Sequence, residues 1–256
     1  MRNATILAIA YLCGRLTAGK EMTTWKGVCT IVLVSLLSAA CAQAELVSVD
    51  FENDVASVTF SGVESWAAAA NPDFGNANIW NSVLIPWSAS GSGGAINPTF
   101  PGLLNSAGAS TPVSLAFTGE MYSFTGATGN RDDIHREFIY INAGFRDLVI
   151  SGLTAGNTAD FYFYNRGDPN QPLRTFNMLL DTDGNGSLDG TFSVNAQTGA
   201  YAPDILVDPS GMIHGRMQQI SNQASWSGFQ MNVVPEPSTI GILALSLLVG
   251  AWRRKR

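Results

Sequence analysis

Residues 226–234, "WSGFQMNVV", decide the fold class of this chain. The apolar members of the stretch are Phe229, Met231 and Val233, and the polar members between them are Gln230 and Asn232. An apolar residue at every second position is the pattern of a β-strand that buries one face and leaves the other in water. The stretch therefore predicts a half-buried strand with one wet face.

The same period of two recurs along most of the chain. Clusters of Gly, Asn, Asp, Pro and Ser separate the apolar runs, as in antiparallel sandwiches. The other predicted strands are 47–51, 57–63, 113–119, 121–126, 137–142, 147–153, 159–165, 174–180 and 191–196. Residues 64–112 are predicted to hold long loops. The pattern predicts one all-β domain over 45–233, an antiparallel two-sheet β-sandwich of the jelly-roll kind, large enough to bury its own core.

The predicted domain is strongly acidic. Residues 45–234 contain 18 acidic residues, 6 arginines and no lysine, a net charge of −12. Such a charge repels the phosphate backbone of nucleic acids. Nucleic acid is therefore excluded as a partner. The acidic surface is typical of a soluble protein in a hydrated extracellular environment.

The N-terminal region, residues 1–44, reads as a secretory signal. Lys26 precedes the apolar run 28–37, and Ala42-Gln43-Ala44 provides the small residues of a signal-peptidase site. The run is too short to span a bilayer, which needs about 20 residues. We expect cleavage after Ala44, and Met22 is the more natural initiator.

All three cysteines lie within the first 41 residues, so cleavage after Ala44 leaves a mature chain without cysteine. Such a chain has no disulfide and no thiolate metal site, and its stability must come from the packed core. Lipidation of Cys41 is the alternative, but residues 38–40, "SAA", lack the large aliphatic residue that such a site needs.

The C-terminal region, residues 234–256, combines three features. Pro235-Glu236-Pro237 is followed by the uncharged, mostly apolar run 240–252 and then by four cations, 253–256. A short apolar run with a basic end predicts a transmembrane helix over 240–252 whose basic end faces the cytoplasm. The two prolines keep the preceding segment out of a helix.

The order, spacing and charge of these last 23 residues resemble the PEP-CTERM sorting signal. The resemblance implies a secreted bacterial protein whose Pro235-Glu236-Pro237 is recognised by a membrane-embedded exosortase that cleaves nearby. It further implies a bacterium that makes exopolysaccharide. The tail is then a transient membrane anchor, and permanent anchoring is the alternative. More loosely, the order of residues 79–83, 149–165 and 227–238 is similar to that of sandwich domains found on PEP-CTERM proteins.

An acidic loop is the sharpest motif inside the domain. Asp181, Asp183, Asn185 and Asp189 occupy positions 1, 3, 5 and 9 of a calcium loop, with Gly at position 6. The stretch resembles the acidic repeats of thrombospondin type 3 and dockerin modules. Position 12 is Phe192, so the bidentate carboxylate is missing. The candidates are a weak Ca²⁺ site and a hairpin loop whose Asp, Asn and Gly make turns.

Three tryptophans of the loop-rich segment are candidate sugar-stacking residues: Trp66, Trp80 and Trp87. A tryptophan offers a flat apolar face and an N–H donor. Burial in the core is the alternative for each of them, and Trp226 is expected to be buried.

Catalysis is not supported by any motif. His135 lies in a charged cluster that a solvated loop explains, and His214 has no acidic neighbour in the sequence closer than Asp208. No nucleophile elbow, zinc-protease, P-loop or dinucleotide fingerprint occurs. The sequence therefore predicts a non-enzymatic, exosortase-sorted surface or matrix protein associated with exopolysaccharide. The alternative is a carbohydrate-binding module with a structural calcium ion, and a more remote one is an enzyme whose site is assembled from loops.

Overall fold

A computed structural model describes the chain at residues 45–52, 74, 79–85, 95–125, 137–141, 144–165, 175–195, 198–220 and 224–234. These residues lie within one compact unit, Ala44–Val234. The predicted signal region and the predicted transmembrane helix fall outside the described residues, as does the predicted strand 57–63. Where the structure describes the chain, it contains no helix of the length and apolarity that a membrane span requires.

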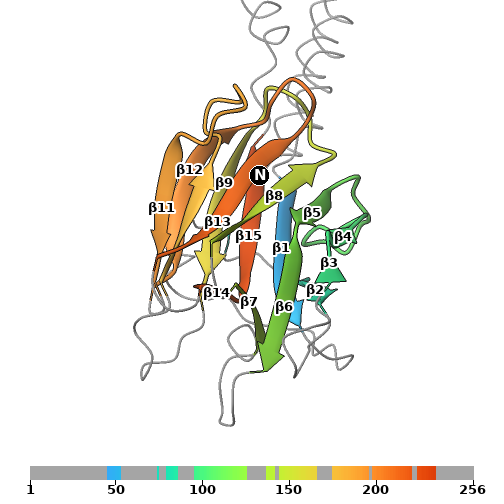
Figure 1. The fold of residues 1–256 in the computed structure, drawn as a ribbon. Helices are drawn as coiled ribbons and strands as arrows, with labels where there is room; N and C mark the ends of the chain where they lie inside the picture. Colours follow the sequence, from blue (N-terminus) through green and yellow to red (C-terminus); the bar gives the residue numbers. More distant parts are fainter. Residues whose placement is uncertain are drawn as a thin grey trace, which may run out of the picture. The chain divides into compact units, whose positions relative to one another are not determined.

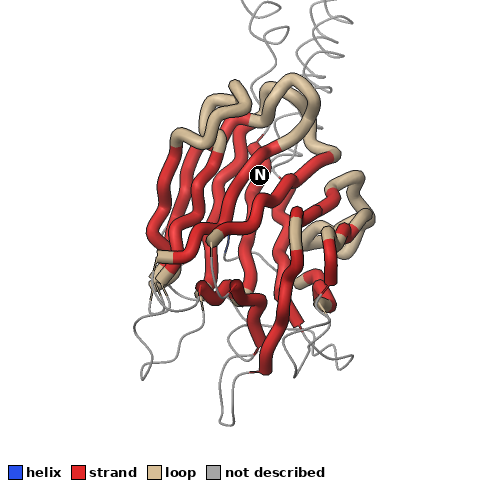
Figure 2. The backbone as a smooth tube through the Cα atoms, in the orientation of Figure 1, coloured by secondary structure: helices blue, strands red, loops and turns tan. Residues whose placement is uncertain are grey.

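The described residues form three β-sheets (Figures 1 and 2). The five-stranded sheet has the order β12 (Ala200–Leu206), β9 (Thr158–Tyr164), β15 (Gly228–Val234), β1 (Glu45–Glu52), β2 (Asn81–Leu84). The six-stranded sheet has the order β11 (Gly190–Val194), β10 (Phe176–Leu180), β13 (Ile213–Gln219), β8 (Phe145–Ser151), β5 (Ser114–Thr118), β4 (Thr99–Phe100). The four-stranded sheet has the order β14 (Ala224–Trp226), β7 (Glu137–Ile141), β6 (Glu120–Thr125), β3 (Ala95–Ile96).

The all-β prediction is confirmed, and the arrangement is consistent with a β-sandwich. Several details differ from the prediction. Strands β12 and β13 were not predicted, and β2, β3 and β4 lie within 64–112, where long loops were expected. Among the described strands, β1 and β2 pair in parallel, whereas the prediction was wholly antiparallel. A third sheet is also present, because the predicted strand 226–234 is divided: β14 ends at Trp226 and pairs with β7, whereas β15 begins at Gly228 and pairs with β1 and β9.

One large apolar core joins the sheets. β1 contributes Val47, Val49 and Phe51, all fully buried, and β15 contributes Phe229, Met231 and Val233. Residues of β5, β8, β10 and β13 belong to the same cluster, and so does Trp226 of β14. The predicted burial of Trp226 and of the apolar positions of β15 is therefore confirmed.

The predicted wet face of the last strand is wrong. Gln230 and Asn232 are 0% and 1% exposed, so β15 is buried on both faces. A second apolar cluster explains this, since it includes Phe74 and Trp80 from outside the strand together with Leu46, Tyr162 and Tyr164 from β1 and β9. A central strand that is covered on both sides no longer needs polar residues for solvent, only hydrogen-bond partners for those it has.

Candidate functional site

The strand pair β1–β15 lies at both predicted processing points. Glu45, the predicted first residue of the mature chain, is the first residue of β1 and pairs with Val233. On its other side β15 pairs with β9 as far as Val234, which lies opposite Thr158. Pro235 of the predicted sorting tripeptide therefore follows directly on the last paired residue of the sheet. The two predicted cuts flank one end of a single strand pair.

Gln230 organises the polar groups on the covered face of this pair. Its Nε2 donates to Oγ of Ser48 at 3.3 Å and to the carbonyl oxygen of Phe74 at 3.1 Å. Its Oε1 accepts a hydrogen bond from the hydroxyl of Tyr164. An amide with partners on both its N and O atoms can be buried without an unsatisfied group, and it ties the carbonyl of Phe74 to this face of the sheet.

Trp80 belongs to this cover. It is 6% exposed, and its ring meets that of Tyr164 edge-on, with centroids 5.7 Å apart. Sugar stacking needs a free ring face, which this burial does not leave. The geometry thus favours the core alternative for Trp80. Trp66 and Trp87 lie outside the described residues.

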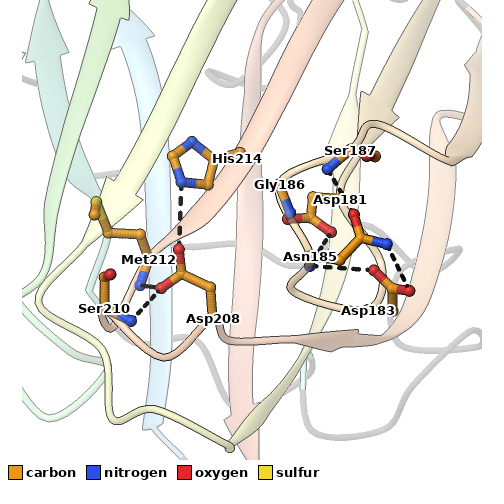
Figure 3. A network of polar contacts seen from close by, with 9 residues as sticks. All are labelled: Asp181, Asp183, Asn185, Gly186, Ser187, Asp208, Ser210, Met212 and His214. Carbon is orange, nitrogen blue, oxygen red and sulfur yellow. Dashed lines mark hydrogen bonds and ion pairs between the residues drawn. The ribbon is translucent and has the colours of Figure 1, made fainter.

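The acidic loop 181–189 connects β10 to β11 and is closed by its own side chains (Figure 3). The carboxylate of Asp181 accepts the backbone N–H of Asn185 at 3.1 Å and that of Gly186 at 2.7 Å. Asp183 accepts the backbone and side-chain N–H groups of Asn185, and Asn185 in turn accepts the N–H of Ser187. These bonds are those of a tight polar turn.

Asp189 is hydrogen-bonded to Thr182, at the other end of the loop. Its Oδ1 accepts the backbone N–H of Thr182 at 2.9 Å and the hydroxyl of Thr182 at 2.7 Å. The backbone N–H of Thr182 is the main cause that lowers the pKa of Asp189 below its ordinary value. Within the described residues, no three His, Cys, Asp or Glu side chains gather closely enough to hold a metal ion. Calcium binding by this loop stays a prediction.

A second carboxylate, which sequence reasoning did not select, closes the loop between β12 and β13 (Figure 3). Oδ1 of Asp208 accepts the backbone N–H groups of Ser210 and Met212, each at 2.8 Å, and Oδ2 lies 3.3 Å from Nε2 of His214. Burial, the largest single effect, acts to raise the pKa of Asp208. The two N–H donors and His214 together outweigh it, so the pKa is lowered.

We expect Asp208→Asn to lower the free energy of unfolding by about 1 kcal/mol at pH 7, because charge-assisted hydrogen bonds become neutral ones. A carboxylate whose pKa is lowered by folding stabilises the protein above its unfolded pKa and loses this contribution as the pH falls through the folded value. The difference between wild type and variant should therefore shrink below about pH 4. Urea unfolding across pH 2.5–7 measures it. A difference that is constant with pH would contradict this assignment.

A third polar cluster lies on the six-stranded sheet. Nε of Arg216 donates to Oδ1 of Asp147 at 2.5 Å, and the guanidinium lies 4.0 Å from the centre of the Phe145 ring. Asp147 and Arg216 face each other in the register of β8 and β13, which the sequence did not pair. Phe145 remains 47% exposed. The cluster thus presents an aromatic ring beside a cation and a carboxylate.

The residues that carry the predicted processing lie outside the described part of the chain. They are Ala42 and Ala44 of the signal-peptidase site and Pro235, Glu236 and Pro237 of the sorting tripeptide. His135 is also outside it. For the sorting tripeptide alone, a comparison with known families supplies an observation.

A search of the curated proteins gave no match. Among solved structures, the chain is similar to one described as TmCBM61 in complex with beta-1,4-galactotriose. The two are 11% identical with a TM-score of 0.24, and the alignment covers 47% of this chain and 83% of that one. Similarity at this level carries no argument about function.

The family description "PEP-CTERM protein-sorting motif" matches residues 233–256. The match begins at Val233, within β15, and runs to the end of the chain. It contains the tripeptide, the apolar run and the basic end on which the resemblance rested. The chain therefore carries a PEP-CTERM protein-sorting motif at residues 233–256, which indicates a secreted, cell-surface substrate of an exosortase.

Proposed function

We propose that this protein is a non-catalytic structural or adhesive module of the extracellular matrix, associated with exopolysaccharide. The observation that carries the proposal is the sorting motif, which begins at Val233 at the end of the last strand, β15. An exosortase that acts there removes the apolar run and the basic end and leaves the described β-domain as the working part. The acidic composition of residues 45–234 supports a soluble life in a hydrated layer.

Replacing the sorting tripeptide tests whether an exosortase recognises and processes this chain. We expect the Pro235→Ala, Glu236→Ala, Pro237→Ala triple variant to keep its C-terminal end and to stay in the membrane fraction, because the protease loses its recognition sequence. The wild type should be recovered without Arg256 from the matrix. Intact mass of the protein from each fraction of the native host measures both. The control is Ser238→Ala, which leaves the tripeptide intact, and equal processing of all three chains would contradict the proposal.

The association with exopolysaccharide is tested on the mature protein from the same host. Sedimentation with matrix polysaccharide isolated from that host should carry the protein down, and an unrelated neutral polysaccharide serves as the control. If the protein stays in solution with its own polysaccharide, the matrix proposal fails even where sorting is normal.

A carbohydrate-binding module is the second candidate, and the Phe145–Arg216–Asp147 cluster favours it. Sugars offer an apolar ring face and a rim of hydroxyl groups. An exposed aromatic ring beside a forked donor and a carboxylate matches both features. Saturable binding of a defined oligosaccharide that is lost on Phe145→Ala and kept on Ile220→Ala would favour this candidate over a bulk structural role.

A further inference from the structure

The two larger sheets differ in whether the face turned away from the large core is covered. On the five-stranded sheet this face carries the second apolar cluster, to which Phe74 and Trp80 belong. On the six-stranded sheet, none of the described side chains that alternate with the core residues of β5, β8, β10, β11 and β13 is buried. The six-stranded sheet therefore presents an open outer face to solvent.

Strand pairing arranges side chains of this outer face in two rows that run across the strands. Within each row, neighbours are direct partners in the antiparallel register. The first row is Thr191, Leu179, Arg216, Asp147 and Thr118, and the second is Ser193, Asn177, Gln218 and Phe145. Adjacent strands lie about 4.8 Å apart, so the first row is about 19 Å long, and the two rows are about 7 Å apart. Together they form the cross-strand strip.

The strip combines an aromatic ring with hydrogen-bonding groups of both kinds. The ring of Phe145 is 47% exposed, and its centre lies 4.0 Å from Cζ of Arg216. A guanidinium has five N–H donors, a carboxylate accepts, and the amides and hydroxyls of the strip do both. A sugar has an apolar ring face that packs on an aromatic ring, and a rim of hydroxyls that donate and accept. The side chains of the strip therefore match a carbohydrate.

The charges select the class of carbohydrate. Nε of Arg216 donates to Oδ1 of Asp147 at 2.5 Å, so the two formal charges of the strip offset each other. Residues 45–234 carry a net charge of −12, which repels an anionic polymer and a second copy of this chain alike. A peptide that adds a strand needs a sheet edge, whereas the strip lies on a face. An uncharged polysaccharide meets none of these obstacles.

We infer that the cross-strand strip binds an uncharged polysaccharide chain that lies across the strands, with one sugar unit stacked on Phe145. The inference rests on the proposed association with exopolysaccharide, to which it adds the contact surface, the direction of the polymer and its charge class. The direction follows from the next pair on the same face, Val149 and Ala116, which offers no hydrogen-bonding side chain. The length of the strip suits several consecutive sugar units.

The first test uses the uncharged fraction of matrix polysaccharide from the native host, separated from the acidic fraction by anion exchange. The mature protein should sediment with this fraction, and Phe145→Ala should raise the Kd about 10-fold or more, as loss of an aromatic anchor does. Leu84→Ala is the matched control, because Leu84 is 43% exposed but belongs to β2 of the other sheet. Raising the NaCl concentration should change wild-type binding by less than about 2-fold, since no ion pair with the ligand is screened.

The outcomes separate this inference from the proposed function. Equal binding of wild type and Phe145→Ala would overturn the inference and leave the association with exopolysaccharide intact. Binding to the acidic fraction alone would overturn the charge class and with it the inference. A wild type that binds neither fraction would overturn the association itself. Sedimentation velocity should show a monomer, and a dimer that Phe145→Ala dissociates would assign the strip to a second copy instead.

The direction of the polymer is tested with oligosaccharides of graded length, made by partial hydrolysis of the uncharged fraction. Asn177 lies in the row of Phe145, two strands away. Asn177→Ala should weaken binding of the long oligosaccharides about 3-fold or more, through loss of a hydrogen bond, and leave the shortest ones unchanged. Ser151→Ala, further along β8 on the same face, is the control. A loss on Ser151→Ala with none on Asn177→Ala would mean that the polymer follows β8, contrary to the inference. Far-UV circular dichroism checks that each variant is folded.

Discussion

Replacing Trp226 with alanine is expected to lower the free energy of unfolding by about 3–5 kcal/mol, the range for loss of a large buried aromatic side chain. Trp226 is fully buried, and its Nε1 donates to the carbonyl oxygen of Gly228 at 2.7 Å. Its ring contacts aromatic rings from several strands, with centroid distances from 4.8 to 6.2 Å: Phe51, Phe117, Phe163, Phe176 and Phe229. The substitution would leave a cavity where these rings meet.

Guanidinium unfolding followed by far-UV circular dichroism measures this effect without relying on tryptophan fluorescence. Ile220→Ala is the control, because Ile220 is 52% exposed and its loss should cost no more than about 0.5 kcal/mol. A loss below about 1 kcal/mol for Trp226→Ala would mean that the rings close over the cavity or that the side chain is not central to the core.

Gly152→Ala is expected to have the second large effect. Gly152 has a φ of +80°, and a Cβ at this position would lie 2.1 Å from the carbonyl oxygen of Pro112. The left-handed conformation alone costs an alanine about 1–2 kcal/mol. The backbone clash should add about 1–3 kcal/mol, because the chain at Pro112 must move.

Gly156→Ala is a matched control for that substitution. Gly156 has almost the same φ, +82°, but a Cβ there would meet nothing within 4 Å. The difference between the two variants in urea unfolding therefore isolates the clash with Pro112. Equal destabilisation of both variants would show that the loop before Ser114 yields without cost.

The apolar alternation of the last strand predicted the core side of β15 correctly, because Phe229, Met231 and Val233 follow one another at a local period of two. The opposite face was predicted wrongly for a non-local reason. Phe74 and Trp80, more than 140 residues earlier in the chain, help to cover Gln230. A local pattern carries no information about a cover that arrives from a distant segment.

Among the described strands, five were not predicted: the short β2, β3 and β4, which lie where long loops were expected, and the longer β12 and β13. The last two each have a physical cause. β12 contains Pro203 and a register shift between Ala202 and Ile205, where Asp204 has a φ of +56°. In β13 one inward position is Gly215, which faces Leu148 and Leu180 and has no side chain that could show the alternation. Proline, a bulge and a glycine each interrupt the period on which strand prediction depends.

The candidate sites, like the strands, were predictable where their signal is local in the sequence and not where it depends on distant residues. The sorting tripeptide was predictable because its signal is linear, and the motif match agrees with it. Contacts between separate strands were not predictable from the sequence. Arg216 contacts Asp147, for example, only because of the register between β13 and β8. The acidic loop was predictable only in part. Its turn follows from the local Asp, Asn and Gly residues, whereas the hydrogen bond from Thr182 to Asp189 could not be predicted.

The adjacency of Glu45 and Val233 has a mechanical consequence. Hydrogen bonds between antiparallel strands run perpendicular to the strands. A force that draws these two ends apart would load the bonds between β1 and β15 one pair at a time, beginning at Glu45, so the pair would unzip under low tension. Load spread over a sheet face is shared by many strands at once. The domain would therefore resist a load applied across its sheet faces. It would unfold at a lower force when the load is applied at its two chain ends.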